Sequence, residues 1–354
     1  MSAQLIHPFT FGDRTQSDLL GGKGANLAEM VRMGLPVPPG FTITTQACRE
    51  YLASGKMPAG LISEINDSLN YLEKSLDKKF GDSTKPLLVS VRSGAKFSMP
   101  GMMETVLNVG MTPEVAEGLA KISGNEKFAW DSYRRFIDMY GRIVCDVPPA
   151  EFHQIENRVL ESHSVKSIQE LDVAGLQALA AAFIKEIEIV TGKPFPIDPR
   201  EHLISSVEAV FHSWNSERAQ LYRRRERISS DLGTAVNIQS MVFGNLSDDS
   251  GTGVAFTRDP ASEGGIIVEG AGGSGSAFVF NSGSGGTNGL ANRWGVALGV
   301  PTGSMNVTPT DFMVTVSSSG VSPTDSNAPT FGSSSFGYGN MHINTTDGEI
   351  WIYV

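Results

Sequence analysis

The chain has 354 residues and a formal net charge of −10, with 40% hydrophobic and 19% charged residues. These proportions are typical of a globular protein with room for two or three domains, and the acidity argues against non-specific nucleic-acid binding. No apolar run is long enough to span a membrane, the N-terminus has no apolar signal core, and two cysteines form no disulfide framework. We therefore expect a cytoplasmic location, with neither a nucleic-acid nor a membrane partner.

A glycine-rich segment, residues 21–24, precedes a helix-favouring run at residues 25–33. A helix N-terminus behind flexible glycines suits an anion, and Lys23 could contact a phosphate from there. The spacing is not that of a Walker A loop. Taken alone, the segment is better explained as an ordinary glycine turn with a solvated lysine.

The elements that follow are mostly helical. A strand is expected at residues 41–45, after a turn fixed by prolines. Apolar residues at helical spacing predict the helices. These helices are expected at residues 46–54, 61–80, 115–122, 128–144, 176–190 and 198–222.

Residues 87–110 carry the clearest chemical pattern. An apolar, β-branched run at residues 87–91 predicts a buried strand with Arg92 at its end, and a loop follows with Gly94 and Gly101. A guanidinium offers a rigid fork of donors for phosphate, and backbone N–H groups beside glycine can approach the same oxygens. The residues alone leave open the alternative of a buried strand with a surface arginine and a methionine-rich core turn.

Further along, residues 236–242 alternate apolar and polar side chains, which predicts a half-buried strand. A glycine-bearing turn at residues 250–253 precedes another expected strand at residues 254–257. Such glycines would let the backbone come close to a phosphate.

The stretch VRSGAKFSMPGMMETVLNVG, residues 91–110, together with GGKGANLAEM and GLPVPPGF nearer the N-terminus, resembles the nucleotide-binding domain of the pyruvate, phosphate dikinase family. The resemblance implies an α+β fold of the ATP-grasp type with a helical insertion at about residues 112–197. It also implies transfer of phosphate from ATP to a histidine on another domain. Lys23 and Arg92 are then the catalytic residues that hold the ATP phosphates.

The resemblance implies further ligand contacts. The cofactor-binding positions that it adds to Lys23 and Arg92 are Gly94, Gly101, Gln239, Met241, Val242, Gly251, Thr252 and Gly253, with residues 239, 241 and 242 at the adenine. Glu269 ends a short apolar strand at residues 265–270 and could bind Mg²⁺, which takes one or two carboxylates together with phosphate oxygens. It is equally well an ordinary strand-end glutamate. The Gln- and Arg-bearing phosphate segment of the family is not found.

After residue 263 the composition changes, because residues 264–354 carry only six charged side chains among many glycines and serines. We therefore predict an ATP-grasp-like domain at residues 1–263, joined to a small β-rich segment of unknown role at 264–354. Strands are expected at 277–280 and 312–316, and a hairpin with Asp347-Gly348 at its turn. The chain then resembles a truncated dikinase with an unrecognised tail.

The expected function is that of an ATP-binding phosphotransferase, a kinase-type transferase that uses ATP and Mg²⁺. Its expected partner is a separate phosphohistidine-carrying domain or a full-length dikinase, because neither the family's GGMTSHAA-like histidine motif nor its pyruvate-binding barrel is found. Whether the chain is an enzyme by itself stays open. The alternatives are a non-catalytic nucleotide-binding remnant and a structural or interaction protein that acts through its β-rich tail.

Overall fold

The computed structural model describes residues 4–247 and 250–256 and, after them, the backbone of separate strands between residues 266 and 352. The chain divides into two compact units, Met1–Val242 and Phe243–Val354. The first unit combines an antiparallel sheet with many helices, which confirms the predicted α+β class. The predicted domain boundary at residue 263 lies within the second unit and stays a prediction.

A five-stranded sheet forms the centre of the first unit, and every pair of neighbouring strands in it is antiparallel. Its order is β1 (Ile6–Pro8), β2 (Gly40–Ile43), β7 (Thr234–Ser240), β5 (Val89–Ala95) and β6 (Thr105–Val109). The middle strand, β7, comes from far along the chain: Thr42 of β2 and Asn237 of β7 are hydrogen-bonded although 195 residues separate them. The sheet therefore joins the beginning of the unit to its end.

The two faces of this sheet differ in character because successive side chains of a strand point to opposite sides. One face is mainly apolar, and five of its residues have exposed fractions of 0%: Ile43, Val89, Val91, Val236 and Ile238. The other face carries a polar row with one residue from each strand. In register across the sheet, this polar row is His7, Thr42, Asn237, Arg92 and Thr105.

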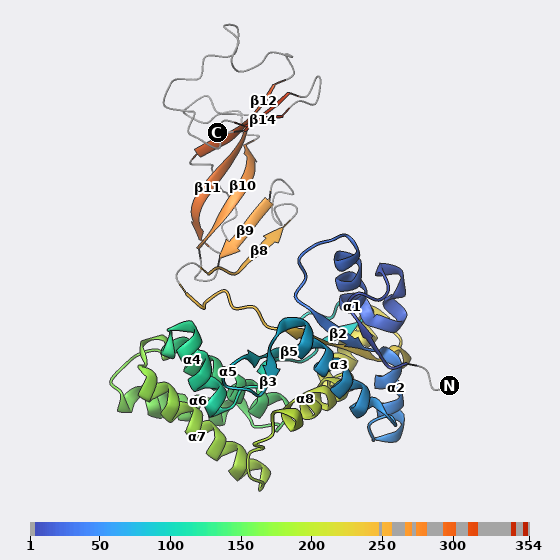
Figure 1. The fold of residues 1–354 in the computed structure, drawn as a ribbon, viewed down its shortest axis with the longest axis vertical. Coiled ribbons are helices and arrows are strands. Elements are labelled where there is room, and N and C mark those ends of the chain that lie inside the picture. The colour runs from blue at the N-terminus through green and yellow to red at the C-terminus, as the bar shows by residue number, and fades with distance from the viewer. Residues whose placement is uncertain are drawn as a thin grey trace. The chain divides into compact units, whose positions relative to one another are not determined.

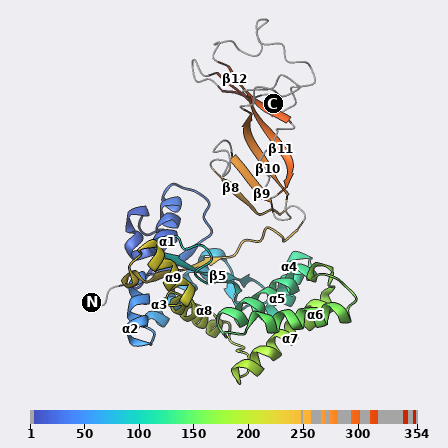
Figure 2. The same cartoon turned by 180° about the vertical axis from the view of Figure 1, so that it is seen from behind.

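Helices surround the sheet, and α1 (Ser17–Arg32) contacts β2, β5 and β7. The remaining helices are α2 (Thr45–Ser54), α3 (Leu61–Leu76), α4 (Pro113–Ser123), α5 (Glu126–Ile143), α6 (Pro149–Ser162), α7 (Val173–Thr191), α8 (Pro199–Ser213) and α9 (Glu217–Glu226). Short 3₁₀ turns occur at Arg14–Gln16, Ile168–Glu170 and Ser230–Leu232, and β3 (Lys79–Phe80) pairs with β4 (Pro86–Leu87). Helices α4 to α7 lie together at one end of the sheet, and α1 to α3 lie at the other (Figures 1 and 2).

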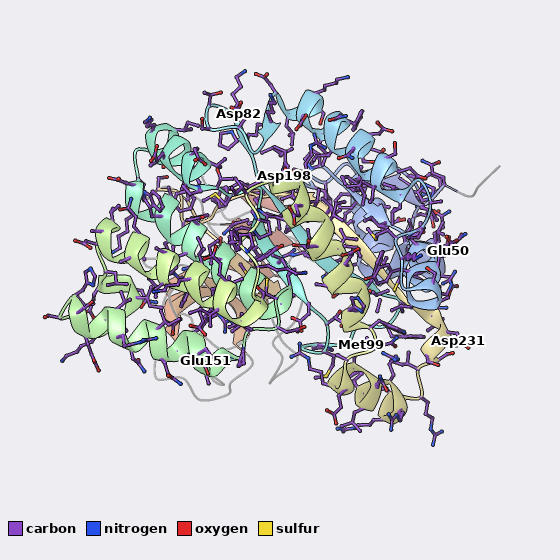
Figure 3. All side chains as sticks on the ribbon, turned by 90° about the horizontal axis from the view of Figure 1, so that it is seen from below. Glu50, Asp82, Met99, Glu151, Asp198 and Asp231 are labelled. Atoms are coloured by element: carbon purple, nitrogen blue, oxygen red, sulfur yellow. The ribbon has the colours of Figure 1, made fainter. Side chains whose placement is uncertain are left out.

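Several predicted boundaries are wrong, each for a local reason. Helix α3 ends at Leu76 rather than continuing to residue 80, because Asp77 adopts a left-handed conformation and the chain then enters β3. The helix expected over residues 198–222 breaks after Ser213. Ser216 starts α9 by accepting a hydrogen bond from the Ala219 backbone N–H, while Asp198 caps the start of α8 in the same way (Figure 3).

Helix α6 lies within the predicted helical insertion, but its bounds were not predicted, because its polar sequence buries only Phe152 and Ile155. By contrast, the aromatic residues at three- and four-residue steps in α5 form a packed face as expected, since Trp130, Tyr133, Phe136 and Tyr140 are all buried. Both cysteines, Cys48 and Cys145, are free, which also agrees with the expectation. None of the described helices is long and apolar enough to cross a membrane.

This aromatic face encloses His202 of α8, which is 2% exposed. Its ring lies 5.1 Å from the rings of Phe136 and Tyr140, and its Nε2 donates to the Pro196 carbonyl at 2.8 Å. Desolvation by these neighbours lowers the pKa of His202 below its usual value. The histidine is therefore held neutral in the folded protein.

We expect acid to destabilise the protein through His202. Its pKa is lower in the folded than in the unfolded state, so below about pH 6.5 the unfolded chain binds the proton first and stability is lost. Urea unfolding of wild type and His202→Leu at several pH values measures this. The variant should lose less stability on acidification, while His7, whose pKa is also lowered by burial, keeps a residual slope in both proteins. If the free energy of unfolding falls equally with pH in the two proteins, His202 is not responsible for the acid sensitivity.

The second unit contains a seven-stranded sheet in the order β14, β13, β12, β11, β10, β9, β8. The strands are β8 (Gly253–Phe256), β9 (Ile266–Gly270), β10 (Ser274–Asn281), β11 (Arg293–Pro301), β12 (Asp311–Ser317), β13 (Met341–Asn344) and β14 (Ile350–Ile352). The strands expected at 277–280 and 312–316 fall within β10 and β12. The antiparallel pairing of β13 with β14 agrees with the predicted hairpin, whose turn at Asp347-Gly348 lies outside the described residues.

Candidate nucleotide site

Helix α1 rests directly on the backbone of β5 through its glycines. Gly21 interrupts the helix with φ 67° and ψ 168°, and a Cβ atom added there would lie 1.5 Å from the Gly94 carbonyl oxygen. A Cβ on Gly22 would lie 2.9 Å from the Lys96 carbonyl oxygen. Only glycine permits this approach, so the glycine-rich segment is a packing requirement as well as a candidate anion site.

This contact places Lys23 at the carboxyl end of β5. Its Nζ donates to the Ser93 carbonyl oxygen at 2.9 Å. The lysine keeps solvent-exposed surface, yet the protein around it lowers its pKa, first through desolvation and second through the positive charge of Arg92. In the described part of the chain neither cation has a carboxylate partner, so two positive charges lie close together without a counter-ion.

A cavity of about 680 Å³ opens beside these groups. Lys23 and Asn26 of α1 and Ser93 of β5 give it a polar wall. Leu27, Met30, Phe97 and Met99 give it an apolar wall. Met99, labelled in Figure 3, is itself buried. A volume of this size with a few convergent polar groups suits a small-molecule ligand.

The loop after β5, residues 96–101, forms one side of the cavity. Lys96 ties this loop to the first turn of α1, because its Nζ lies 2.6 Å from the Asp18 carboxylate. The same ammonium group lies 5.7 Å from the centre of the Phe97 ring. At Gly101, whose φ is 71°, an added Cβ would meet no atom within 4 Å, so the far end of the loop is open.

The structure brings Lys23, Arg92, Gly94 and Gly101 to one region, with Lys23, Gly94 and Gly101 lining the cavity. The expectation that Arg92 ends its strand is wrong. Strand β5 continues to Ala95 because β7 pairs with it as far as Thr234, and Arg92 lies within the strand beside Asn237 and Thr105. Its side chain, half-buried, belongs to the polar row that faces α1.

Of the predicted adenine residues, Gln239 lies near the end of β7 and Met241 and Val242 follow the strand, and none of the three lines this cavity. Gln239 occupies the next row of the same sheet face, where its Nε2 donates to the Pro38 carbonyl at 3.0 Å. Met241 donates its backbone N–H to the Leu88 carbonyl at 2.8 Å, and Val242 is 72% exposed. These assignments stay predictions.

The remaining predicted contacts belong to the second unit. Gly251 and Thr252 are exposed, and Thr252 packs against Gly244, where a Cβ would lie 1.5 Å from its Oγ1. Gly253 begins β8, and Glu269 lies in β9 opposite Val254. The side chain of Glu269 lies outside the described residues, so its role as a metal ligand stays a prediction.

Sequence reasoning missed several cavity and polar-row residues, among them Asn26, Ser93, Lys96, Thr105 and Asn237. The alternation of polar and apolar residues in each strand was a usable signal for the polar row. It could not show which strands are neighbours, and the row exists only because β7 lies between β2 and β5.

Comparison with known proteins agrees with this geometry. The fold and the similarities below place the chain among nucleotide-binding domains. The family described as "Pyruvate phosphate dikinase, AMP/ATP-binding domain" matches residues 17–74 and 53–284, and the chain belongs to this family.

Pyruvate, phosphate dikinase of Clostridium symbiosum is 49% identical over 271 residues, which cover 75% of this chain and 31% of the relative. The chloroplastic pyruvate, phosphate dikinase 1 of Zea mays is 50% identical over 250 residues, covering 70% of this chain and 26% of the relative. The Entamoeba histolytica dikinase is 48% identical over 261 residues, 73% and 29% of the two chains. The chain thus spans between a quarter and a third of the length of these relatives.

Proposed function

We propose that the chain is an ATP-grasp nucleotide-binding domain that binds ATP and passes a phosphoryl group to a histidine carried by another domain, as part of or partner to a pyruvate, phosphate dikinase. The observation that supports this most is the meeting of Lys23 and Arg92 beside the cavity without a counter-ion in the described residues. Two neighbouring cations repel each other, and a polyphosphate would relieve that repulsion.

Phosphoryl transfer depends more on positioning and charge stabilisation than on covalent chemistry of the protein. Lys23 would hold a phosphate as a compact point charge, and the Arg92 guanidinium would offer two parallel donors to phosphate oxygens. Charge that develops on the transferred group would meet both cations in a partly desolvated site. The apolar wall of Leu27, Met30 and Phe97 suits the remaining, less polar part of a nucleotide.

Mg²⁺ would accompany ATP by bridging its phosphate oxygens. Among the described residues there is no group of three or more His, Cys, Asp or Glu side chains that could hold a metal ion. Mg²⁺ commonly takes one or two carboxylates from a protein together with phosphate oxygens, and Glu269 remains the proposed source of one. The roles of Lys23 and Arg92 do not depend on it.

Calorimetric titration with ATP and Mg²⁺ tests the binding. We expect wild type to bind and Arg92→Ala to bind about 10- to 100-fold more weakly, because a charge-assisted hydrogen bond contributes about 1.5–3 kcal/mol. Arg224→Ala is the matched control, since Arg224 is exposed on α9 and, unlike Arg92, is not a charge that acts on Lys23. A folded wild type that binds no ATP would overturn the proposal and direct attention to the β-rich second unit as an interaction module.

Transfer is tested by adding a phosphohistidine domain from one of the dikinase relatives and measuring both histidine phosphorylation and the nucleotide released. Transfer of a single phosphoryl group leaves ADP, whereas AMP is released only if the histidine takes a pyrophosphoryl group or added inorganic phosphate accepts the second phosphoryl group. Binding together with phosphorylation supports the proposal in full. Binding without phosphorylation would leave the alternative of a non-catalytic nucleotide-binding module, which the missing Gln- and Arg-bearing segment favours.

A further inference from the structure

Asn237 occupies the centre of the polar row. It lies on β7, the middle strand of the sheet, with Thr42 opposite it on one side and Arg92 on the other. Its exposed fraction is 0%, and its Oδ1 accepts a hydrogen bond from the Thr42 hydroxyl at 2.9 Å. A fully buried amide beside Arg92 is an unusual choice for the middle of a sheet, where apolar side chains predominate.

The amide of Asn237 touches the two backbone segments that carry the site. A Cβ added to Gly94 of β5 would lie 2.4 Å from its Nδ2, and one added to Gly24 of α1 would lie 3.0 Å from its Oδ1. The next atoms around the Gly94 position, the Asn237 Cγ and the Lys23 Cβ, are 3.6 Å away. Asn237 is thus packed between the strand that bears Arg92 and the helix that bears Lys23.

The stability of the fold does not explain why position 237 carries an amide side chain. Its Nδ2 is buried and has no hydrogen-bond partner in the described part of the chain. Leaving a buried donor unmet is unfavourable, and a leucine of similar size would avoid that penalty. A fully satisfied hydrogen-bond network is therefore not the reason for an asparagine at position 237.

We infer that Asn237 is a positioning residue whose buried amide holds Gly24 of α1 and Gly94 of β5 at the separation that places Lys23 beside Arg92. The inference rests on the proposed function for the ligand that the two cations hold. It explains why glycine occupies both positions: Gly94 is not in the left-handed region, so its lack of a side chain is required by space alone.

The placement of Lys23 can be measured without nucleotide. The rate at which an amine-reactive ester acylates Lys23, followed by peptide mass spectrometry over a range of pH, reports the pKa of this lysine. We expect the pKa to rise towards the ordinary lysine value in Asn237→Ala and Asn237→Ser, because Lys23 then moves away from Arg92 and into solvent. Asn108→Gly is the control: Asn108 is a buried asparagine of β6 that also has one unmet polar atom, and glycine tolerates its φ of 58°.

A double-mutant cycle tests the contact itself through ATP affinity. Gly94→Ala should weaken ATP binding at least tenfold, because its Cβ meets the amide nitrogen of Asn237. In the Asn237→Ser background, which removes that nitrogen, the same Gly94→Ala change should cost about threefold or less. Equal losses in both backgrounds would overturn the inference, as would folded Asn237 variants with the wild-type Lys23 pKa.

The two proposals fail in different ways. If wild type binds no ATP, the proposed function fails, and the Lys23 titration still decides the role of Asn237. If Asn237→Ala does not fold, Asn237→Ser supplies the same test, because serine keeps a polar group in the polar row.

Discussion

Replacing Gly21 with alanine is expected to destabilise the protein by about 3 kcal/mol or more, from left-handed strain together with overpacking. Gly21 has a φ of 67°, and its new Cβ would lie 1.5 Å from the Gly94 carbonyl oxygen, a backbone atom that cannot rotate away. Helix α1 would have to lift from β5. Urea unfolding followed by circular dichroism measures the loss.

Gly34→Ala separates the two causes. Gly34 follows α1 with a φ of 78°, and an added Cβ there meets no atom within 4 Å. This variant has a positive φ without the clash, so a loss of about 1 kcal/mol is expected. If Gly21→Ala and Gly34→Ala cost the same, the contact between α1 and β5 is not the reason for glycine at position 21.

Replacing Lys23 with methionine is expected to weaken ATP binding about 10- to 100-fold and to change its pH dependence. The pKa of Lys23 is lowered by desolvation and by Arg92. The charge that attracts phosphate is therefore present at neutral pH and is lost, as the pH rises, earlier than for an ordinary lysine. Binding a polyanion favours the charged form, so binding at high pH should take up a proton.

Calorimetry in buffers of different ionisation enthalpy measures that proton uptake. Wild type should take up a fraction of a proton per ATP at alkaline pH, and Lys23→Met should take up less. Lys121→Met, on the exposed surface of α4, should behave as wild type. Unchanged affinity and unchanged proton uptake in Lys23→Met would exclude this lysine from the phosphate site.

The sequence predicted which segments form helices and strands better than it predicted where those helices and strands begin and end. Amphipathic spacing located α5 and α7, and alternation located β7, because these patterns reflect burial on one face. The break between α8 and α9 escaped prediction, since Ser216 is a capping residue in a stretch that is otherwise compatible with helix. The bounds of α6, within the predicted helical insertion, could not be predicted because the helix buries too few apolar residues to show a period.

The candidate site was predicted in part, and by resemblance rather than by spacing. Residues alone could not decide whether Lys23 was a solvated lysine or a phosphate ligand. Its position beside Arg92 depends on the contact between Gly21 and Gly94, which lie far apart in sequence. The sequence did not indicate a role for Asn237, because a polar residue in a strand of alternating character is usually exposed. In the structure Asn237 is fully buried.

The position of β7 between β2 and β5 has a consequence for how the chain folds. During synthesis, β2 and β5 leave the ribosome long before β7 does. Until β7 has been made, each of these two strands has an unpaired edge, and such an edge can pair with other chains. Strand pairing across 195 residues closes a very long loop, which favours slow assembly. The polar row that carries Arg92 is therefore complete only after this last strand has docked, when almost all of the first unit has been synthesised.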